Sequence, residues 1–132
     1  LGLGVSSIGF IENAFFQNVK DLSDYAACLG QKRLPVLRGF VMRKEDKLRR
    51  FVIQSLMCHF ELDKQDVFRH FGIEFDLHFA SLKPKLDMLS DQGLLEQTPE
   101  KLLPTPLGGL FIRVVASCFD QYLQTGRFSK AV

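Results

Sequence analysis

RGFVMRKEDKLRRFVIQSLMCHFELD, residues Arg38–Asp63, is the stretch that decides the fold. Apolar residues recur in it at helical spacing, and the stripe is wide enough to need cover on several sides. Its members are Leu48, Phe51, Val52, Ser55, Leu56 and His59, flanked by Ile53, Met57 and Phe60. Glu45 and Asp46 place carboxylates in the first turn, where the helix dipole is positive. The stretch therefore predicts a core helix that begins near Lys44.

Two shorter helical patterns follow the core helix. Asp63 is the predicted N-cap of the first, and Gly72 its terminator. Ser81 is the predicted N-cap of the second, which ends at Gly93 and turns Leu82, Leu86 and Leu89 inward. These segments are the natural cover for the core helix.

The last third of the chain predicts a hairpin and a final helix. Residues 94–97 and 101–104 flank a turn rich in Thr and Pro, which is typical of a small hairpin. Thr105-Pro106 is a cap followed by proline at the first helical position. From Leu107 to Tyr122 the apolar spacing predicts one unbroken helix. The resulting fold class is mainly α (α+β), a winged-helix-like helical domain with a small β-hairpin.

Before the core helix the chain predicts fewer elements. Residues 1–10, LGLGVSSIGF, fit a short buried strand ending in a tight turn, and their glycines do not match a phosphate-binding G-x-G-x-x-G. Residues 18–30 predict a helix ended by Gly30, and residues 36–42 an extended segment. One face of that helix carries Leu22, Tyr25, Ala26 and Leu29.

Composition bounds the class of protein. At 132 residues, with 46% apolar content, the chain fits one globular domain. Its net charge of +2 disfavours a nucleic-acid partner, and no apolar run has the length of a membrane span. Three widely spaced cysteines predict reduced, buried thiols in a reducing compartment, and hence a cytoplasmic protein. The chain starts without an initiator Met, so we expect it to be cut from a longer one.

Candidate chemistry is sparse. Cys58, His59, His70 and His78 are the metal-type ligands, but their spacing matches no zinc pattern, so we predict no metal site. Asp76 and His78 could place an acid next to a base. No nucleophile lies near them in the sequence, so the favoured interpretation is that they cap or hydrogen-bond a loop. We therefore predict no catalytic residue in this chain.

Basic residues gather near the start of the core helix. They are Arg43, Lys44, Lys47, Arg49 and Arg50, interrupted by Glu45 and Asp46. A solvated face with local ion pairs is the default interpretation, and a surface for an anionic ligand or a neighbouring domain is the alternative. Lys83 and Lys85 lie on the helix that would be the recognition helix of a DNA-binding winged helix. Asp87 and Asp91 oppose them, so a free-standing DNA-binding module is only the second hypothesis.

Several strings taken together carry a resemblance. They are LGLGVSSIG, RGFVMRKEDKLRR, FVIQSLMCHFELD, DLHFA, the passage from DQGLLE to TPLGGLFIR, CFDQYL and RFSKAV, in this order. The set resembles the C-terminal part of the oxygen-independent coproporphyrinogen III oxidases, radical S-adenosylmethionine enzymes of haem biosynthesis, and covers almost the whole chain. A haem-chaperone-like paralogue of these enzymes is the alternative within the same resemblance.

The resemblance implies two parts of the enzyme with different roles. In that family a partial (β/α) barrel holds a [4Fe-4S] cluster on a CxxxCxxC motif, binds S-adenosylmethionine, and oxidatively decarboxylates coproporphyrinogen III to protoporphyrinogen IX. The C-terminal helical domain covers the barrel mouth and encloses the substrate. By this resemblance residues 1–17 are the last strand and turn of a truncated barrel, and residues 18–132 are the C-terminal domain. Its partners are the missing N-terminal barrel and coproporphyrinogen III. The cysteines lack the cluster spacing, so this segment alone should hold no cofactor and be inactive.

The resemblance also implies site residues. Those next to substrate and S-adenosylmethionine are Gly4, Val5, Ser6, Ser7 and Ile8, with Ile8 the best contact. Arg38, Arg49 and Arg50 would bind the four substrate carboxylates or brace the domain against the barrel, and bracing is favoured. Arg43 departs from the family, which more often has a helix-capping Thr or Ser there.

Overall fold

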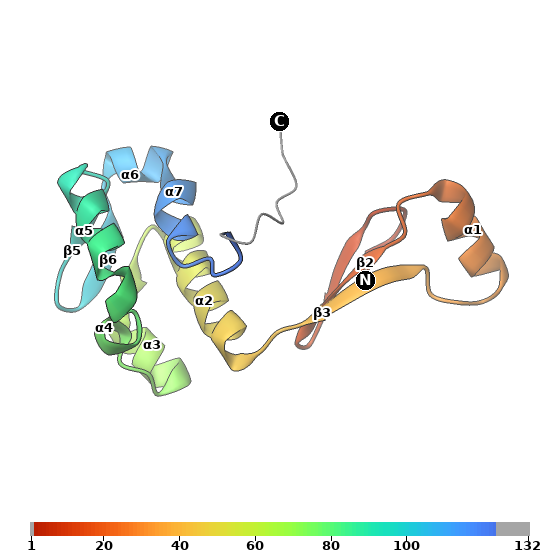
Figure 1. Ribbon diagram of the computed structural model, residues 1–132, viewed down its shortest axis with the longest axis horizontal. Helices are drawn as coiled ribbons and strands as arrows, with labels where there is room; N and C mark the ends of the chain where they lie inside the picture. Colours follow the sequence, from red (N-terminus) through yellow and green to blue (C-terminus); the bar gives the residue numbers. More distant parts are fainter. Residues whose placement is uncertain (1, 124–132) are drawn as a thin grey trace. The chain divides into compact units, whose positions relative to one another are not determined.

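The computed structural model describes residues 2–123 (Figure 1). The chain forms two compact units: unit 1 ends at Glu45, and unit 2 begins at Asp46, so the core helix, which starts at Lys44, lies in unit 2 except for its first two residues. From the sequence we predicted an earlier boundary, after residue 17. Strand pairing explains the later division, because residues 36–41 pair with residues 14–18 and hold the first part of the chain together. The assignment of residues 1–17 to a barrel stays a prediction.

Unit 1 is a three-stranded antiparallel sheet with one helix in the connection between its second and third strands. Its elements are β1 (Ile8–Ile11), β2 (Ala14–Asn18), α1 (Leu22–Gly30) and β3 (Val36–Val41). The strand order is β1-β2-β3, so β2 is paired on both sides. The predicted extended segment at residues 36–42 is confirmed as β3.

The beginning of unit 1 differs from the strand predicted over residues 1–10. Strand β1 begins only at Ile8. Gly4 has a φ of 94° and Ser6 a φ of 58°, and such left-handed backbone interrupts a strand. The preceding residues therefore form a turn rather than an extended strand.

Two further differences concern β2 and α1. Strand β2 is absent from the sequence prediction, because Phe15 and Phe16 place apolar side chains on both faces and remove the alternation of a half-buried strand. Helix α1 begins later than residue 18, after Asp21 caps it by accepting a 2.8 Å hydrogen bond from the backbone N–H of Ser23. Its apolar face is largely exposed, since Leu22 is 72% and Leu29 50% accessible.

A bulge interrupts the pairing of β2 with β3. Gln17 pairs with Arg38 and Asn18 with Val36, which leaves Leu37 as the extra residue between them. A bulge of this kind increases the local twist and re-aims the neighbouring side chain. Arg38 directly follows it.

Unit 2 is a helical domain with a small three-stranded sheet, which confirms the predicted α+β, winged-helix-like architecture. Its elements are α2 (Lys44–Gln54), the π-helix η1 (Ser55–His59), β4 (Leu62–Asp63), α3 (Lys64–Phe71), α4 (Phe75–His78), the 3-10 helix η2 (Ala80–Leu82), α5 (Lys83–Asp91), β5 (Leu95–Gln97), β6 (Lys101–Pro104), α6 (Pro106–Leu110) and α7 (Ile112–Ser117). Strand β6 lies between β4 and β5 and is antiparallel to both. The pairing with β4 turns the predicted hairpin into a sheet.

The core of unit 2 is built on α2 and η1. Leu48, Val52 and Leu56 are fully buried, as the helical stripe predicts. The ring of Phe79 meets that of Phe119 edge to face, with centroids 5.3 Å apart. The other buried members of the core are Leu62, Val67, Phe75, Leu86, Leu89, Leu94, Leu95, Leu102 and Val115. All members of this core lie in unit 2.

The core helix changes geometry before it ends. Its last turn, η1, is a π-helix, and the chain leaves it at Phe60 with a left-handed φ of 55°. Because a π-turn holds an extra residue, the side chains after Leu56 rotate off the core stripe. Cys58 and His59 are consequently exposed, so the predicted burial of the Cys58 thiol and the predicted place of His59 in the stripe are both wrong.

Most predicted helix ends are confirmed. The side chain of Asp63 caps α3 through a 2.7 Å hydrogen bond from the N–H of Gln65. Gly72 ends the same helix with a φ of 68°. The hydroxyl of Thr105 accepts a 3.0 Å hydrogen bond from the N–H of Gly108 at the start of α6. The hairpin of β5 and β6 also lies where it was predicted.

Two predicted features of the later helices are wrong. Ser81 does not cap α5, because it lies within η2, and Leu82 already has helical backbone where α5 begins. The last helix is not continuous either. It breaks at Phe111 into α6 and α7, just after the helix-weakening pair Gly108-Gly109, and it stops at Ser117. The RFSKAV string lies outside the described residues.

Candidate functional site

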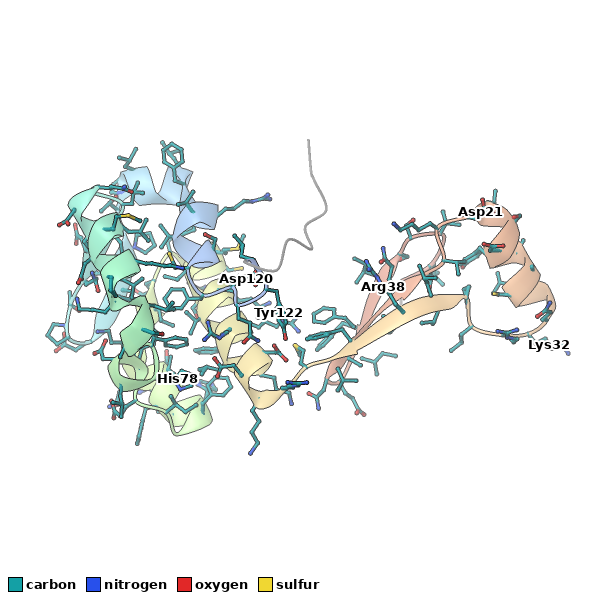
Figure 2. The ribbon with its side chains drawn as sticks, viewed as in Figure 1. Asp21, Lys32, Arg38, His78, Asp120 and Tyr122 are labelled. Atoms are coloured by element: carbon teal, nitrogen blue, oxygen red, sulfur yellow. The ribbon has the colours of Figure 1, made fainter. Side chains whose placement is uncertain are left out.

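A hollow of about 460 Å³ opens on the sheet of unit 1. All three strands contribute to its walls, through Ile8, Phe15, Phe16, Gln17, Arg38, Gly39 and Phe40. The walls are mainly aromatic and aliphatic, and Arg38 is the one charged side chain among these lining residues. Figure 2 shows Arg38 rising from the sheet of this unit.

One row of side chains crosses this hollow. Ile8 pairs with Gln17 between β1 and β2, and Gln17 pairs with Arg38 between β2 and β3, so all three point to the same face. The side-chain oxygen Oε1 of Gln17 accepts a 2.9 Å hydrogen bond from Nε of Arg38. Its Nε2 donates to the carbonyl of Ser6 at 3.3 Å. The row therefore joins the segment that precedes β1 to Arg38.

The row unites residues that the sequence singled out separately. Ile8 and Arg38 were predicted as site residues for different roles, and both line the hollow. Ser6, predicted together with Ile8, is connected to the hollow through the hydrogen bond from Gln17 to its carbonyl. Gln17, which connects them, was missed, because no motif contains it. An informative signal would have been its place in the middle strand, and β2 itself was not predicted.

The turn that carries the other predicted residues is held by two polar side chains. The buried amide of Asn18 donates to the carbonyls of Gly2 and Gly4, at 3.2 Å and 2.9 Å. The hydroxyl of Tyr25 accepts a 3.1 Å hydrogen bond from the N–H of Gly4. These bonds fix the backbone of Gly4, Val5, Ser6 and Ser7 beside the first residue of β1.

The chemistry of the hollow is that of binding. Phe15, Phe16 and Phe40 offer apolar contact, and the guanidinium of Arg38 suits a carboxylate or phosphate. None of the lining residues is a nucleophile or a general acid–base group at neutral pH. An amphipathic anion is the ligand class that fits.

Arg49 lies in unit 2 and has contacts inside it. Its Nη1 donates a 3.0 Å hydrogen bond to the carbonyl of Phe119, and its guanidinium lies 5.3 Å from the ring centre of Phe79. Arg49 thus ties α2 to the segment after α7 and to the aromatic core. Arg50 follows it in the same helix and is partly exposed. Bracing of either arginine against a barrel stays a prediction.

A buried carboxylate near the start of α2 was not predicted as such. Asp46 is 7% accessible and accepts hydrogen bonds of 2.6 Å from Nε2 of Gln121 and from the hydroxyl of Tyr122. Figure 2 shows Tyr122 and Asp120 beside α2. Asp46 was expected to complement the helix dipole. Its carboxylate also holds the segment that follows α7.

The candidate metal ligands do not meet. Among residues 2–123 no group of three or more His, Cys, Asp and Glu side chains could hold a metal ion. Nδ1 of His70 lies 2.8 Å from the carbonyl of Asp66, and His78 stacks edge to face on Phe79. Asp76 forms a 2.8 Å ion pair with Lys64.

The helix expected to read DNA carries little free positive charge. On α5, Lys83 forms an ion pair with Asp87 one turn later. The hydrogen bond from Lys83 lowers the pKa of the Asp87 carboxyl, so the pair stays charged and internally neutral at physiological pH. Across the described residues, no helix combines the length and apolar character needed to span a bilayer.

Comparison with known proteins assigns the chain to a family. The family model described as the HemN C-terminal domain matches residues 42–111. The chain belongs to the HemN C-terminal domain family. The matched region runs from the end of β3 through α6, and therefore contains the whole core helix and the hairpin.

Named relatives extend the match beyond this HemN C-terminal domain. An oxygen-independent coproporphyrinogen III oxidase of Pseudomonas aeruginosa is 38% identical over 135 residues, which is 100% of this chain and 29% of the relative. One of Thermostichus vulcanus is 41% identical and covers 100% of this chain and 42% of its own length. The chain therefore spans less than half of the relatives it matches.

A solved structure agrees with the HemN C-terminal domain fold. It is described as coproporphyrinogen III oxidase (HemN) from Escherichia coli, a radical SAM enzyme. Its TM-score to this chain is 0.89 at 34% identity, covering 93% of this chain and 28% of that one. The match includes most of unit 1, since 93% of the chain is far more than unit 2 alone.

Proposed function

We propose that the chain is the C-terminal, substrate-enclosing part of an oxygen-independent coproporphyrinogen III oxidase. The observation that supports this most strongly is the match over the entire chain to relatives of that name at 38% and 41% identity. The whole enzyme would oxidatively decarboxylate coproporphyrinogen III to protoporphyrinogen IX, a step of haem biosynthesis. The remaining length of those relatives would supply the catalytic barrel.

The cofactors of the whole enzyme belong outside this chain in this proposal. A radical SAM enzyme uses a [4Fe-4S] cluster and S-adenosylmethionine to generate the radical that attacks the substrate. Cys28, Cys58 and Cys118 do not fit a cluster, because they are far apart in sequence and among residues 2–123 no group of ligands gathers around one point. The chain's own residues would bind and enclose the substrate, and the chain alone would be inactive.

Within this proposal the hollow of unit 1 is the part that faces the ligands. Ile8 and the turn Gly4–Ser7 would lie next to S-adenosylmethionine and substrate, since the turn is held rigidly and presents backbone at its surface. Arg38 would bind a substrate carboxylate. Arg49 would act indirectly, by holding α2 against the core of unit 2.

The partners and location follow from the same proposal. The main partner would be the N-terminal barrel of the same polypeptide, and the ligand would be coproporphyrinogen III. The enzyme would work in the cytoplasm, where thiols stay reduced, which suits three unpaired cysteines. Neither nucleic acid nor a membrane would take part.

The test is to join this chain to the barrel of a relative and to measure product. We expect the fused, cluster-loaded protein to form protoporphyrinogen IX, and the 132-residue chain and the barrel to form none separately. A matched control carries the same barrel with a variant chain that lacks the Arg49 guanidinium, Arg49→Met. Absence of product from a folded, cluster-loaded wild-type fusion contradicts the proposal.

A further inference from the structure

The Arg38 guanidinium is held from one side only. Its Nε donates to Gln17, and in the described part of the chain Gln17 is its only hydrogen-bond partner, with no acidic side chain paired to it. The two terminal nitrogens, Nη1 and Nη2, therefore keep their donors for another group. A planar pair of donors of this kind matches a carboxylate in bidentate fashion.

Gln17 determines how that guanidinium is presented. Both ends of its amide are engaged: Oε1 accepts from Arg38, and Nε2 donates to the Ser6 carbonyl. Turning the amide over would place its NH₂ group against the Nε–H of Arg38, donor against donor, so the orientation is fixed by its partners. Gln17 is also less exposed than Arg38, because it lies in the middle strand.

The backbone supplies a second, independent device at the same place. The bulge at Leu37 immediately precedes Arg38, and bulges are enriched beside functional sites, where they redirect one side chain. Phe40, two residues after Arg38 in β3, points to the same face and also lines the hollow. The strand is thus locally shaped around one arginine.

We infer that Gln17 is a positioning residue that orients Arg38 so that its terminal nitrogens bind one carboxylate of an amphipathic ligand. The apolar body of the ligand rests against Phe15 and Phe40, which line the same hollow. The inference rests on the proposed function, which makes a propionate of the tetrapyrrole substrate the occupant. It adds the residue that orients the arginine, and it gives a reason for a polar residue directly after Phe15 and Phe16 in β2.

The experiment measures binding and turnover separately in the full-length parent protein. Fluorescence titration uses coproporphyrin III, the stable oxidised porphyrin with four carboxylates, and its tetramethyl ester in the same detergent. The variants are Arg38→Ala, Gln17→Ala and Gln17→Glu. The controls are Gln31→Ala and Arg33→Ala, because Gln31 and Arg33 form an exposed 3.3 Å hydrogen bond that has no part in the hollow.

We expect Arg38→Ala to weaken binding of the tetracarboxylate about 10- to 100-fold, which is the usual effect of losing a charge-assisted hydrogen bond. Gln17→Ala should weaken it about fivefold, because the charge remains but its orientation is lost. Gln17→Glu should weaken it at least as much, because the new carboxylate occupies Arg38. The ester should bind all variants equally, and the KM for substrate should rise while kcat changes little.

The outcomes separate the inference from the proposed function. Variants that bind the tetracarboxylate like the controls overturn the inference, as does a wild type that binds neither probe. Equal losses of affinity for the tetracarboxylate and for its tetramethyl ester also overturn the inference. Such losses would mean that the substitution disturbs apolar contacts or the docking of the rest of the polypeptide. A wild type that binds through Arg38 and Gln17 but forms no product overturns the proposed function alone.

Discussion

Unit 1 and unit 2 differ in how much apolar surface each buries. Every member of the buried core lies in unit 2, whereas none of the described residues of unit 1 is a buried large apolar side chain. Unit 1 instead exposes Ile8, Phe10 and Phe40 along one face of its sheet, by 65%, 40% and 42%. A three-stranded sheet with one small helix needs more cover than this to be stable. The difference is the one expected under the function proposed above, in which the rest of a longer polypeptide covers unit 1, while unit 2 holds a buried core of its own.

The largest expected effect comes from truncating the core of unit 2. Phe119 is fully buried, so Phe119→Ala should lower the free energy of unfolding by about 3–5 kcal/mol. The matched change in unit 1, Phe40→Ala, should lower it by less than about 1 kcal/mol, because that ring is already solvated. Urea denaturation followed by circular dichroism measures both. Equal effects would contradict the proposed difference between the units.

A close backbone contact provides the next test. A Cβ on Gly108 would lie 1.8 Å from the carbonyl oxygen of Leu94, the residue before β5, so Gly108→Ala must move α6 away from Leu94. We expect a loss of about 3 kcal/mol in unfolding free energy. Gly30→Ala is the control, because a Cβ at Gly30 would meet no atom within 4 Å and the backbone there is not left-handed. A Gly108→Ala protein as stable as Gly30→Ala would show that the contact is relaxed in solution.

A helix cap in unit 2 should have a smaller effect. Thr105→Ala removes the hydroxyl that accepts from Gly108 and also donates to the carbonyl of Gly93 at 2.6 Å. The expected loss is about 1 kcal/mol in unfolding free energy. Thr105→Ser keeps the hydroxyl and should recover most of it. A serine variant as unstable as the alanine variant would assign the loss to packing of the methyl group instead.

The smallest effect is a difference in thiol reactivity rather than in stability. Burial raises the pKa of the Cys118 thiol, so its thiolate, the reactive form, is scarce until the pH rises above the ordinary thiol range. Cys58 is exposed at the end of η1. Iodoacetamide at neutral pH followed by peptide mass spectrometry should modify Cys58 first and Cys118 slowly, with the Cys118 rate rising at alkaline pH. Equal rates at neutral pH would contradict the burial of Cys118.

The predictability of the fold from sequence divides along the same line as the two units. In unit 2 the buried stripe, the caps Asp63 and Thr105 and the terminator Gly72 agree with one another, and all were predicted. The break at Phe111 was missed, because the apolar spacing continues through it while packing of Gly108 on Leu94 sets the helix direction. Exposure of Cys58 was missed because a π-turn leaves no mark on periodicity.

Unit 1 was harder to predict because its faces are not divided into buried and solvated. Phe15 and Phe16 are adjacent and both apolar, so the strand that contains them has no alternation. The site residues Ile8 and Arg38 came from the family resemblance, whereas Gln17 came only from strand register, which no local pattern encodes. A sheet with apolar side chains on both faces gives a weak signal in its own sequence.

Hydrogen exchange tests the central claim, that unit 1 is completed by the rest of a longer enzyme, most directly. The comparison is between the 132-residue chain alone and the same residues in the full-length parent. We predict that amides of β1, β2 and β3 exchange quickly in the isolated chain and become strongly protected in the parent, while those of α2 and α3 are equally protected in both. Strands of unit 1 that are as protected alone as in the parent would contradict the claim.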